Sequence, residues 1–175
     1  KLLRSLSHPN ILKIKGASGN KRVFIAVTEY VIGGNLQDRL VQPYSTRRFL
    51  LVAKEICSGL LFAHNNQICH GNLRPQNILF DANDEIKIAD FGLKEHYTDD
   101  QEKHNWYQNN KEPTSIAADI FATGVIFYQM LCSELPRWRQ NKLIRPKHFS
   151  ERPKPLQELI IAMLQKDPAA RPSNL

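Results

Sequence analysis

The chain of 175 residues has no long hydrophobic run, only three cysteines and no internal repeat, and each absence narrows its possible functions. Its longest apolar stretch, Ile120 to Leu131, is too short to cross a bilayer and predicts a buried helix. The amino-terminal residues lack the apolar core of a secretory signal, so we expect no membrane segment and a cytoplasmic location. Cys57, Cys69 and Cys132 are far apart in the sequence, which argues against a disulfide framework and against a metal site.

Positive charge is in modest excess. The chain has 24 Lys and Arg against 17 Asp and Glu, a formal net charge of +7. Such a balance suits an acidic partner, nucleic acid or an anionic lipid surface. The basic residues are scattered, however, and the densest stretch, 137–154, is interrupted by prolines. We expect that stretch to be a solvated loop, and no nucleic-acid partner is predicted.

Hydrophobic periodicity predicts a mainly helical body preceded by a short strand pair. Apolar residues recur at helical spacing in three segments, 46–64, 117–132 and 156–164. Strands are expected at 11–14 and 23–28 around a turn at 16–20, and at 78–80 and 86–89 around an acidic turn at 81–84. Gly33-Gly34 has the composition of a hinge. The sequence therefore predicts an α+β chain in two parts, 1–33 and 34–175.

One stretch carries most of the chemical information. His70-Gly71-Asn72-Leu73-Arg74-Pro75-Gln76-Asn77 is followed, thirteen residues after Asn77, by Asp90-Phe91-Gly92. The two segments resemble the catalytic loop and the metal-binding turn of the protein-kinase family, His-Arg-Asp-Leu-x-x-x-x-Asn and Asp-Phe-Gly. Four other segments resemble further landmarks of that family in the required order: His8 to Ile11, Thr28 to Val31, Asp119 to Gly124, and Asp167 to Ser173.

This resemblance implies a protein-kinase-like fold of the serine/threonine type, with Pro75 typical of that subfamily. Residues 1–33 would be a remnant of the β-rich N-lobe and residues 34–175 the mainly helical C-lobe. Because the chain lacks an initial Met and opens inside an apparent helix, we expect a fragment without the start of the N-lobe. The glycine-rich loop and the strand lysine of the family would lie before Lys1.

The resemblance also implies ATP and Mg²⁺ as cofactors, although a fragment without the roof of the pocket is expected to bind ATP poorly. Asp90 and Asn77 would hold the metal, because hard cations prefer oxygen ligands. Arg74 would hold the transferred phosphate. The adenine would lie against four residues: Thr28 as gatekeeper, Glu29 and Val31 through backbone groups, and Leu79 beneath the purine.

Other residues are expected to be structural. The resemblance places Leu3, Ile14, His70 and Phe91 in a stacked spine, with Asp119 holding the backbone of the catalytic loop. The remaining histidines, His64 among them, are expected to be ordinary, because none has a partner at ligand spacing.

The chain departs from the family pattern at the catalytic loop itself. Asn72 stands where the family has the Asp that receives the substrate proton. A carboxamide cannot accept that proton, and general-base assistance is typically worth ~10²–10⁴ in rate. Gly71 stands where the family has an Arg that pairs with a phosphorylated activation loop, so that phosphate clamp is lost.

The activation segment departs as well, because no Ala-Pro-Glu motif is evident. Trp106 to Asn110 is in its place, with Asn110 where a Glu would pair with Arg171. A buried arginine without a partner is costly. We therefore expect some carboxylate to reach Arg171, and Glu112 is the candidate.

Three functions compete at this stage. The departures favour a catalytically impaired pseudokinase that acts on protein partners as a scaffold or allosteric regulator. The intact Asp90 and Asn77 favour an active serine/threonine kinase that transfers the γ-phosphate of ATP to protein hydroxyls. A looser similarity of 119–131 and 156–173 to the kinase–ribonuclease sensors of the unfolded-protein response favours a regulatory kinase-like module fused to a C-terminal ribonuclease.

Overall fold

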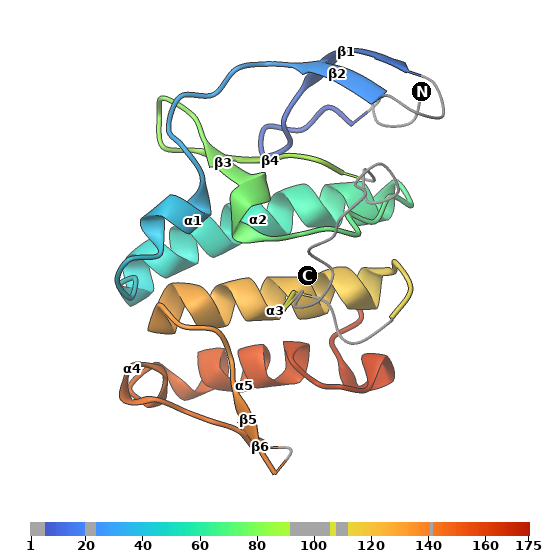
Figure 1. Cartoon of the computed structure of the whole chain (residues 1–175). Helices are drawn as coiled ribbons and strands as arrows, with labels where there is room; N and C mark the ends of the chain where they lie inside the picture. The colour runs from blue at the N-terminus through green and yellow to red at the C-terminus, as the bar shows by residue number, and fades with distance from the viewer. Residues whose placement is uncertain (1–5, 20–23, 92–105, 108–111, 141) are drawn as a thin grey trace.

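The structure is a computed structural model that describes residues 6–19, 24–91, 106–107, 112–140 and 142–175. Three long helices lie in successive layers, with small antiparallel sheets above and below them (Figure 1). The helices are α2 (Thr46–Asn65), α3 (Ile116–Cys132) and α5 (Lys154–Met163). None of the helices in the described ranges is both long and apolar enough to cross a membrane.

Helix α3 forms the centre of the stack. Every residue from Asp119 to Cys132 is buried, which confirms the prediction of a helix that is apolar nearly all round. The helix begins where the Ser115 hydroxyl accepts a hydrogen bond from the Ala118 N–H. Helix α2 begins in the same way at Ser45 and covers one side of α3, while α5 covers the other.

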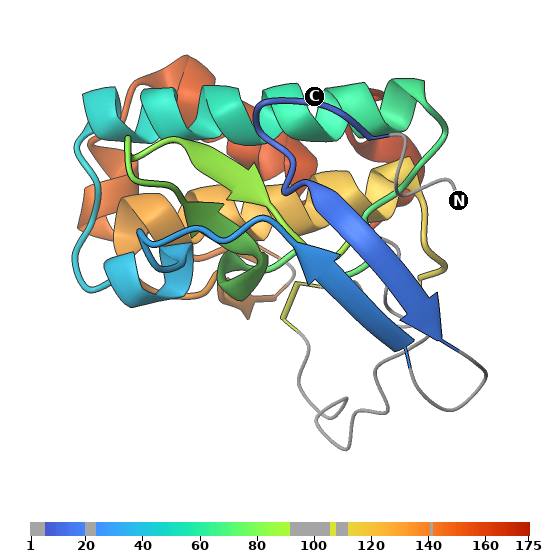
Figure 2. The same ribbon diagram turned by 90° about the horizontal axis from the view of Figure 1, so that it is seen from above.

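Within the described ranges, three two-stranded antiparallel sheets complete the fold. The pairs are β1 (Ile14–Gly19) with β2 (Phe24–Thr28), β3 (Ile78–Phe80) with β4 (Ile86–Ile88), and β5 (Trp138–Arg139) with β6 (Lys142–Leu143). Seen from above, β1 and β2 extend beyond the helical stack (Figure 2). The sheet β3–β4 packs on α2 with Ile78, Phe80, Ile86 and Ile88 fully buried.

The predicted first strand pair is shifted along the chain. Ile11 forms only an isolated bridge with Ile88, and the expected turn at 16–19 belongs to β1 instead. The sequence analysis did not predict three short elements, namely α1 (Leu36–Arg39), α4 (Lys147–Ser150) and the hairpin β5–β6. The stretch 137–154 is mostly exposed within its described residues, as expected, but the expectation that it is a loop is wrong. Elements of two to four residues are too short to show a periodicity.

Candidate functional site

The hinge is held directly on strand β3. The Gly33 N–H donates to the Phe80 carbonyl at 2.8 Å, and the Phe80 N–H donates to the Gly34 carbonyl at 2.9 Å. A Cβ atom at Gly33 would lie 2.5 Å from the Phe80 oxygen, so only glycine permits this approach. Leu79, also on β3, forms an isolated β-bridge with Asn35, which follows the hinge. Leu79, the residue predicted to lie beneath the purine, is therefore positioned next to the hinge.

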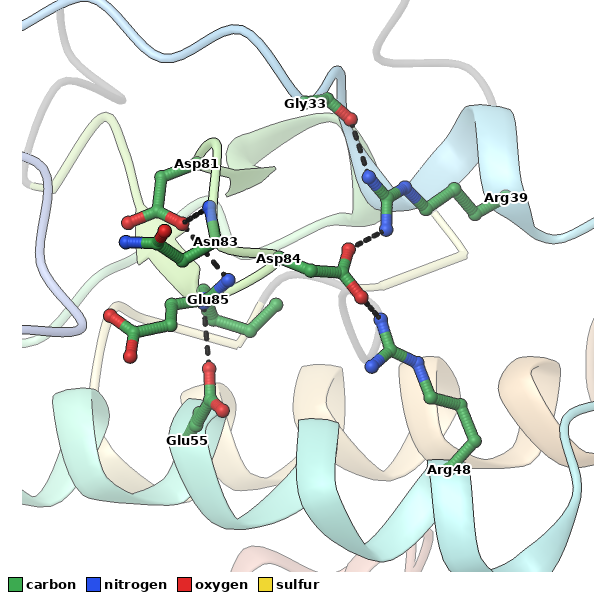
Figure 3. Close-up of polar contacts among 9 residues, drawn as sticks. Gly33, Arg39, Arg48, Glu55, Asp81, Asn83, Asp84 and Glu85 are labelled. Atoms are coloured by element: carbon green, nitrogen blue, oxygen red, sulfur yellow. Dashed lines mark hydrogen bonds and ion pairs between the residues drawn. The ribbon is translucent and has the colours of Figure 1, made fainter.

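A charged cluster at the β3–β4 turn ties this hinge to the helices. The Asp84 carboxylate lies between the guanidinium groups of Arg39 and Arg48, and Arg39 also donates to the Gly33 carbonyl at 2.7 Å (Figure 3). The hydrogen bond from Arg39 is the main cause that lowers the pKa of Asp84. Arg39 further lies 3.6 Å from the centre of the Phe80 ring, a cation–π contact. One arginine thus joins α1, the hinge and β3.

The turn below this cluster is fixed by carboxylates that accept backbone hydrogen bonds. Asp81 accepts from the Asn83 and Glu85 N–H groups at 2.8 and 3.0 Å. Glu55 on α2 accepts from the Ile86 N–H at 2.6 Å (Figure 3). Acidic residues at these positions satisfy donors that a hairpin of this length leaves open. This confirms the predicted acidic turn at 81–84.

One buried carboxylate accepts the hydrogen bonds that hold the backbone of the catalytic-loop segment. Asp119, in the first turn of α3, accepts from the His70 N–H at 2.7 Å and from the Gly71 N–H at 2.9 Å. The predicted structural role of Asp119 is therefore confirmed. Its third donor is the His64 ring, with Nε2 at 2.9 Å from Oδ2. The sequence analysis did not predict this contact of His64, because it spans 55 residues and no local spacing indicates it.

His70 is a core histidine with a defined tautomer. Its Nδ1 accepts from the Asn72 N–H at 3.2 Å, so the ring proton is on Nε2, which lies 2.8 Å from the Ala89 carbonyl. Burial of the fully enclosed ring lowers the pKa of His70, which keeps the imidazole neutral. The ring also contacts Phe91 at a centroid distance of 4.6 Å. This agrees with the expected stacking, although Leu3 lies outside the described residues.

The predicted metal and proton-acceptor residues lie on adjacent segments. Asn77 donates through its side-chain amide to the Asn72 carbonyl at 2.9 Å, and its own carbonyl accepts from the Ala89 N–H at 2.8 Å. The second bond places Asn77 next to the segment that continues into Asp90. Asp90 has φ +62°, a backbone conformation that a non-glycine residue adopts at a cost. Gly92 lies outside the described residues.

Asn72 is half-buried, and its neighbours form hydrogen bonds with its backbone rather than with its side chain. The N–H contacts His70 and the carbonyl contacts Asn77. Within the described part of the chain, no hydrogen bond of the Asn72 carboxamide is observed. The loop shape therefore does not depend on which group ends this side chain.

Gly71 has a structural reason to lack a side chain. Its φ is +76°, and a Cβ atom would lie 2.9 Å from Thr114 Cγ2 and 3.2 Å from Thr114 Oγ1. The segment that enters α3 therefore passes directly over the position where the family has an arginine. Loss of the arginine and close approach of Thr114 belong to the same local arrangement.

Arg171 finds the carboxylate that was predicted for it. Its Nη1 and Nη2 atoms lie 3.0 and 2.9 Å from the two carboxylate oxygens of Glu112. The Arg171 side chain is fully buried, and the Glu112 side chain is 9% exposed. This bidentate pair is the expected substitute for the family's glutamate, whose position is taken by Asn110, a residue outside the described ranges. It fastens the start of α3 to the carboxyl-terminal end of the chain.

Of the four residues predicted to contact adenine, only Thr28, at the end of β2, borders the cavity next to Asp90. A small cavity of about 30 Å³ is bordered by Thr28, Ile14, Asp90 and Phe91, residues that come from three separate parts of the sequence. The Glu29 N–H donates to the Lys13 carbonyl at 2.9 Å, which continues the β1–β2 pairing into the hinge. Val31 follows and is half-buried. Thr28, the predicted gatekeeper, and Asp90, the predicted metal ligand, thus border the same cavity.

Arg74 lies beside the activation-segment residue Tyr107. Its Nε is buried and has no hydrogen-bond partner among the described residues. Tyr107 donates to Gln129 at 2.8 Å, and burial raises the pKa of Tyr107 to about 12.

The three cysteines are reduced. Burial raises the pKa of Cys57 to about 11 and that of Cys132 to about 12, and it raises the pKa of Cys69 as well. Thiols in such surroundings are poor nucleophiles and poor metal ligands. Cys57 and Cys132 belong to the packing of α2 and α3, whereas Cys69 lies in the segment after α2.

Comparison with known proteins agrees with this architecture. The layered helices, the small sheets and the anchored loop form an α+β kinase-like fold with a partial N-lobe. The chain matches the family described as "Protein kinase domain" over residues 1–175. A probable serine/threonine-protein kinase of Dictyostelium discoideum is 31% identical over 190 residues, which cover 97% of this chain and 23% of that protein. The chain belongs to the protein kinase family and spans about a quarter of that relative's length.

Proposed function

We propose that this domain is a catalytically impaired protein kinase that acts through protein partners, as a scaffold or allosteric regulator. The observation that carries the proposal is Asn72. Its backbone has the contacts that hold the loop in shape, whereas its side chain ends in a carboxamide at the position of the proton acceptor. The loop can therefore keep its form while lacking the base.

The predicted division into an N-lobe remnant, 1–33, and a C-lobe, 34–175, is part of this proposal, as is a cytoplasmic location. The hinge at Gly33 is the natural boundary, because it is bonded to β3 of the second part. The charged cluster of Arg39 and Asp84 supports the boundary from the C-lobe side.

The residues present fit a nucleotide with Mg²⁺. Asp90 and Asn77 supply two oxygen-bearing side chains on adjacent segments, and Mg²⁺ is commonly held by few protein ligands together with phosphates. Arg74, in the same loop, would supply a positive charge for a phosphate. Thr28, Glu29, Val31 and Leu79 would contact the adenine from the hinge and β3. When bound, ATP would supply the phosphoryl group, and this chain's residues would orient it and neutralise its charge.

One observation favours the alternative of a working serine/threonine kinase. Asp90 keeps a left-handed backbone conformation, which costs a non-glycine residue about 1–3 kcal/mol. Strain of this kind is retained mainly where a site requires it. A bound metal would be such a requirement, so some phosphotransfer could survive without a base.

The test compares the full-length protein with its Asn72→Asp variant in Mg-ATP and a Ser/Thr peptide library. Restoring the carboxylate should raise the transfer rate by ~10²–10⁴, the usual value of general-base assistance. The carboxamide makes no observed side-chain bond, so the substitution should not disturb folding. Asp90→Ala is the control that removes the metal ligand and should abolish any transfer.

An ordinary kinase rate in the natural protein, eliminated by Asp90→Ala and unchanged by Asn72→Asp, would refute the impaired-kinase proposal. Nucleotide binding is measured separately, as the shift in melting temperature with Mg-ATP. A shift that Asp90→Ala removes supports a nucleotide-binding scaffold. Absence of any shift assigns the domain a nucleotide-independent role and rules out the active alternative.

A further inference from the structure

The basic stretch that follows α3 forms the wall of a large open hollow. The hairpin β5–β6 faces the end of α5 and the turn after it, and together they border a volume of about 820 Å³. This lies within the range of about 300–1,000 Å³ that is usual for ligand clefts. In Figure 1 the hairpin is at the opposite end of the helical stack from β1–β2. The hollow is therefore separate from the candidate nucleotide site.

The floor of the hollow is apolar. Trp138 and Leu143 come from the hairpin, and Ile161 and Leu164 come from the end of α5. Trp138, Leu143 and Ile161 are partly buried residues packed against the core, and Leu164 is 3% exposed. An occupant that covers this floor gains from removing apolar surface from water.

The rim is basic. Lys142, Arg145 and Lys166 border the hollow, against a single acid, Asp167. The Asp167 carboxylate already accepts from the Ala169 N–H at 3.0 Å. Lys142 and Arg145 are exposed, and neither forms an ion pair or side-chain hydrogen bond within the described part of the chain. The rim thus offers two exposed cations to a partner of opposite charge.

The hollow is held open by contacts to the core. The Ile144 N–H donates to the Arg137 carbonyl at 2.8 Å, which closes the base of the hairpin. The Ile144 carbonyl accepts from the Tyr128 hydroxyl at 3.0 Å, and Tyr128 on α3 is only 1% exposed. A surface that is already in place needs little ordering when a partner binds.

We propose that this hollow docks an acidic segment of a partner protein that carries leucine or a similar aliphatic side chain. The carboxylates would face Lys142 and Arg145, and the aliphatic groups would lie on the floor beside Leu143 and Ile161. Nucleic acid fits less well, because its recognition relies on phosphate contacts and on stacking along several aromatic rings, whereas three of the four floor residues are aliphatic. The inference rests on the proposed function only in requiring a protein partner.

The test measures binding of a fluorescein-labelled peptide, Glu-Asp-Leu-Glu-Asp-Leu-Asp-Glu, to the full-length protein by fluorescence anisotropy. Low ionic strength, about 50 mM, keeps the screening length long enough for rim charges to act. Reversing both rim cations, K142E with R145E, should weaken binding at least about tenfold, because like charges would then face the peptide. The control is R47E with K54E, which reverses two exposed cations on α2 and should change affinity by less than about twofold.

A second peptide, with serine in place of both leucines, keeps the charge and removes the apolar anchors. It should bind at least about fivefold more weakly, because the floor is then left uncovered. Equal weakening by the two charge-reversed variants, equal affinity of the two peptides, or no saturable binding would each overturn the proposal.

Competition distinguishes the other acidic partners. An oligodeoxythymidine or a vesicle containing phosphatidylserine that binds the rim more tightly than the leucine peptide would replace the proposed occupant and refute it. The proposal fails or stands independently of the impaired-kinase proposal. In the K142E/R145E variant, Asn72→Asp should change the phosphotransfer rate by the same factor as in the natural protein. Mg-ATP should also shift the melting temperature of both proteins by the same amount.

Discussion

The pair formed by Glu112 and Arg171 makes a quantitative prediction about stability. Glu112→Gln keeps the size and shape of the side chain but removes the charge that faces a fully buried guanidinium. Breaking a buried pair by removing one partner costs about 3–5 kcal/mol, because the remaining charge is left uncompensated. The bidentate distances of 3.0 and 2.9 Å indicate a pair of good geometry.

Other groups reduce that cost. Arg171 also donates to the carbonyls of Gln165 at 2.8 Å, Ala117 at 2.6 Å and Lys166 at 3.2 Å, and its guanidinium lies 4.9 Å from the centre of the Phe121 ring. These contacts partly solvate the charge when the carboxylate is gone. We therefore expect a loss of about 3 kcal/mol, at the lower end of the range.

The measurement is urea unfolding followed by circular dichroism, with the slope on denaturant checked so that the midpoint shift reports stability. Glu151→Gln is the matched control. It removes a carboxylate from the exposed pair with Lys147, whose atoms are 3.8 Å apart, and should change stability by no more than about 0.5 kcal/mol. A loss below about 1 kcal/mol for Glu112→Gln would refute the reasoning that this pair fastens the start of α3.

Three further outcomes are expected. Gly71→Arg should destabilise the protein by about 1–3 kcal/mol in thermal unfolding, because it combines a positive φ with the 2.9 Å approach of Thr114; an unchanged melting temperature would contradict the account of this position. Because the pKa of His70 is lowered in the folded state, the unfolded state binds more protons below pH 6.5, and the contribution of this histidine to stability is lost as the pH falls below that value. Between about pH 8 and about pH 5, the free energy of unfolding should therefore decline by at most about 1.4 kcal/mol per pH unit from this group. The substitution His70→Phe should flatten that decline. Cys57, with a pKa of about 11, should react with iodoacetamide more slowly than the less buried Cys69, as followed by mass spectrometry, and equal rates would be inconsistent with its burial.

Much of the fold was predictable because its signals are local. The long helices α2 and α3 have apolar residues at helical spacing together with serine caps, and the acidic turn at 81–84 has the residues that such a turn requires. The motif segments could be placed in order for the same reason. The partner of Arg171 was predictable because the family resemblance implies a buried arginine there, a buried guanidinium requires a carboxylate, and Glu112 is close in sequence to Asn110, which stands at the position of the family's glutamate.

Long-range contacts that neither a local pattern nor the family resemblance indicates were not predictable. His64 and Asp119 are 55 residues apart, and nothing in either neighbourhood signals that they meet. The hairpin β5–β6 has two residues in each strand, too few for a pattern, and its form is set by contacts such as that of Tyr128 with the Ile144 carbonyl. The basic stretch was therefore interpreted as a loop although it forms the wall of a hollow.

By itself, the sequence determined the family, the order of the segments and the identity of the side chain at position 72, because these depend on residue types and spacing along the chain. Only the tertiary structure decided that Thr114 occupies the space beside Gly71, that His64 contacts the carboxylate of Asp119, and that exposed cations gather around an apolar hollow. The physical reason is that close packing depends on which surfaces of the folded chain contact one another. The local sequence around two distant residues does not indicate whether those residues will be in contact.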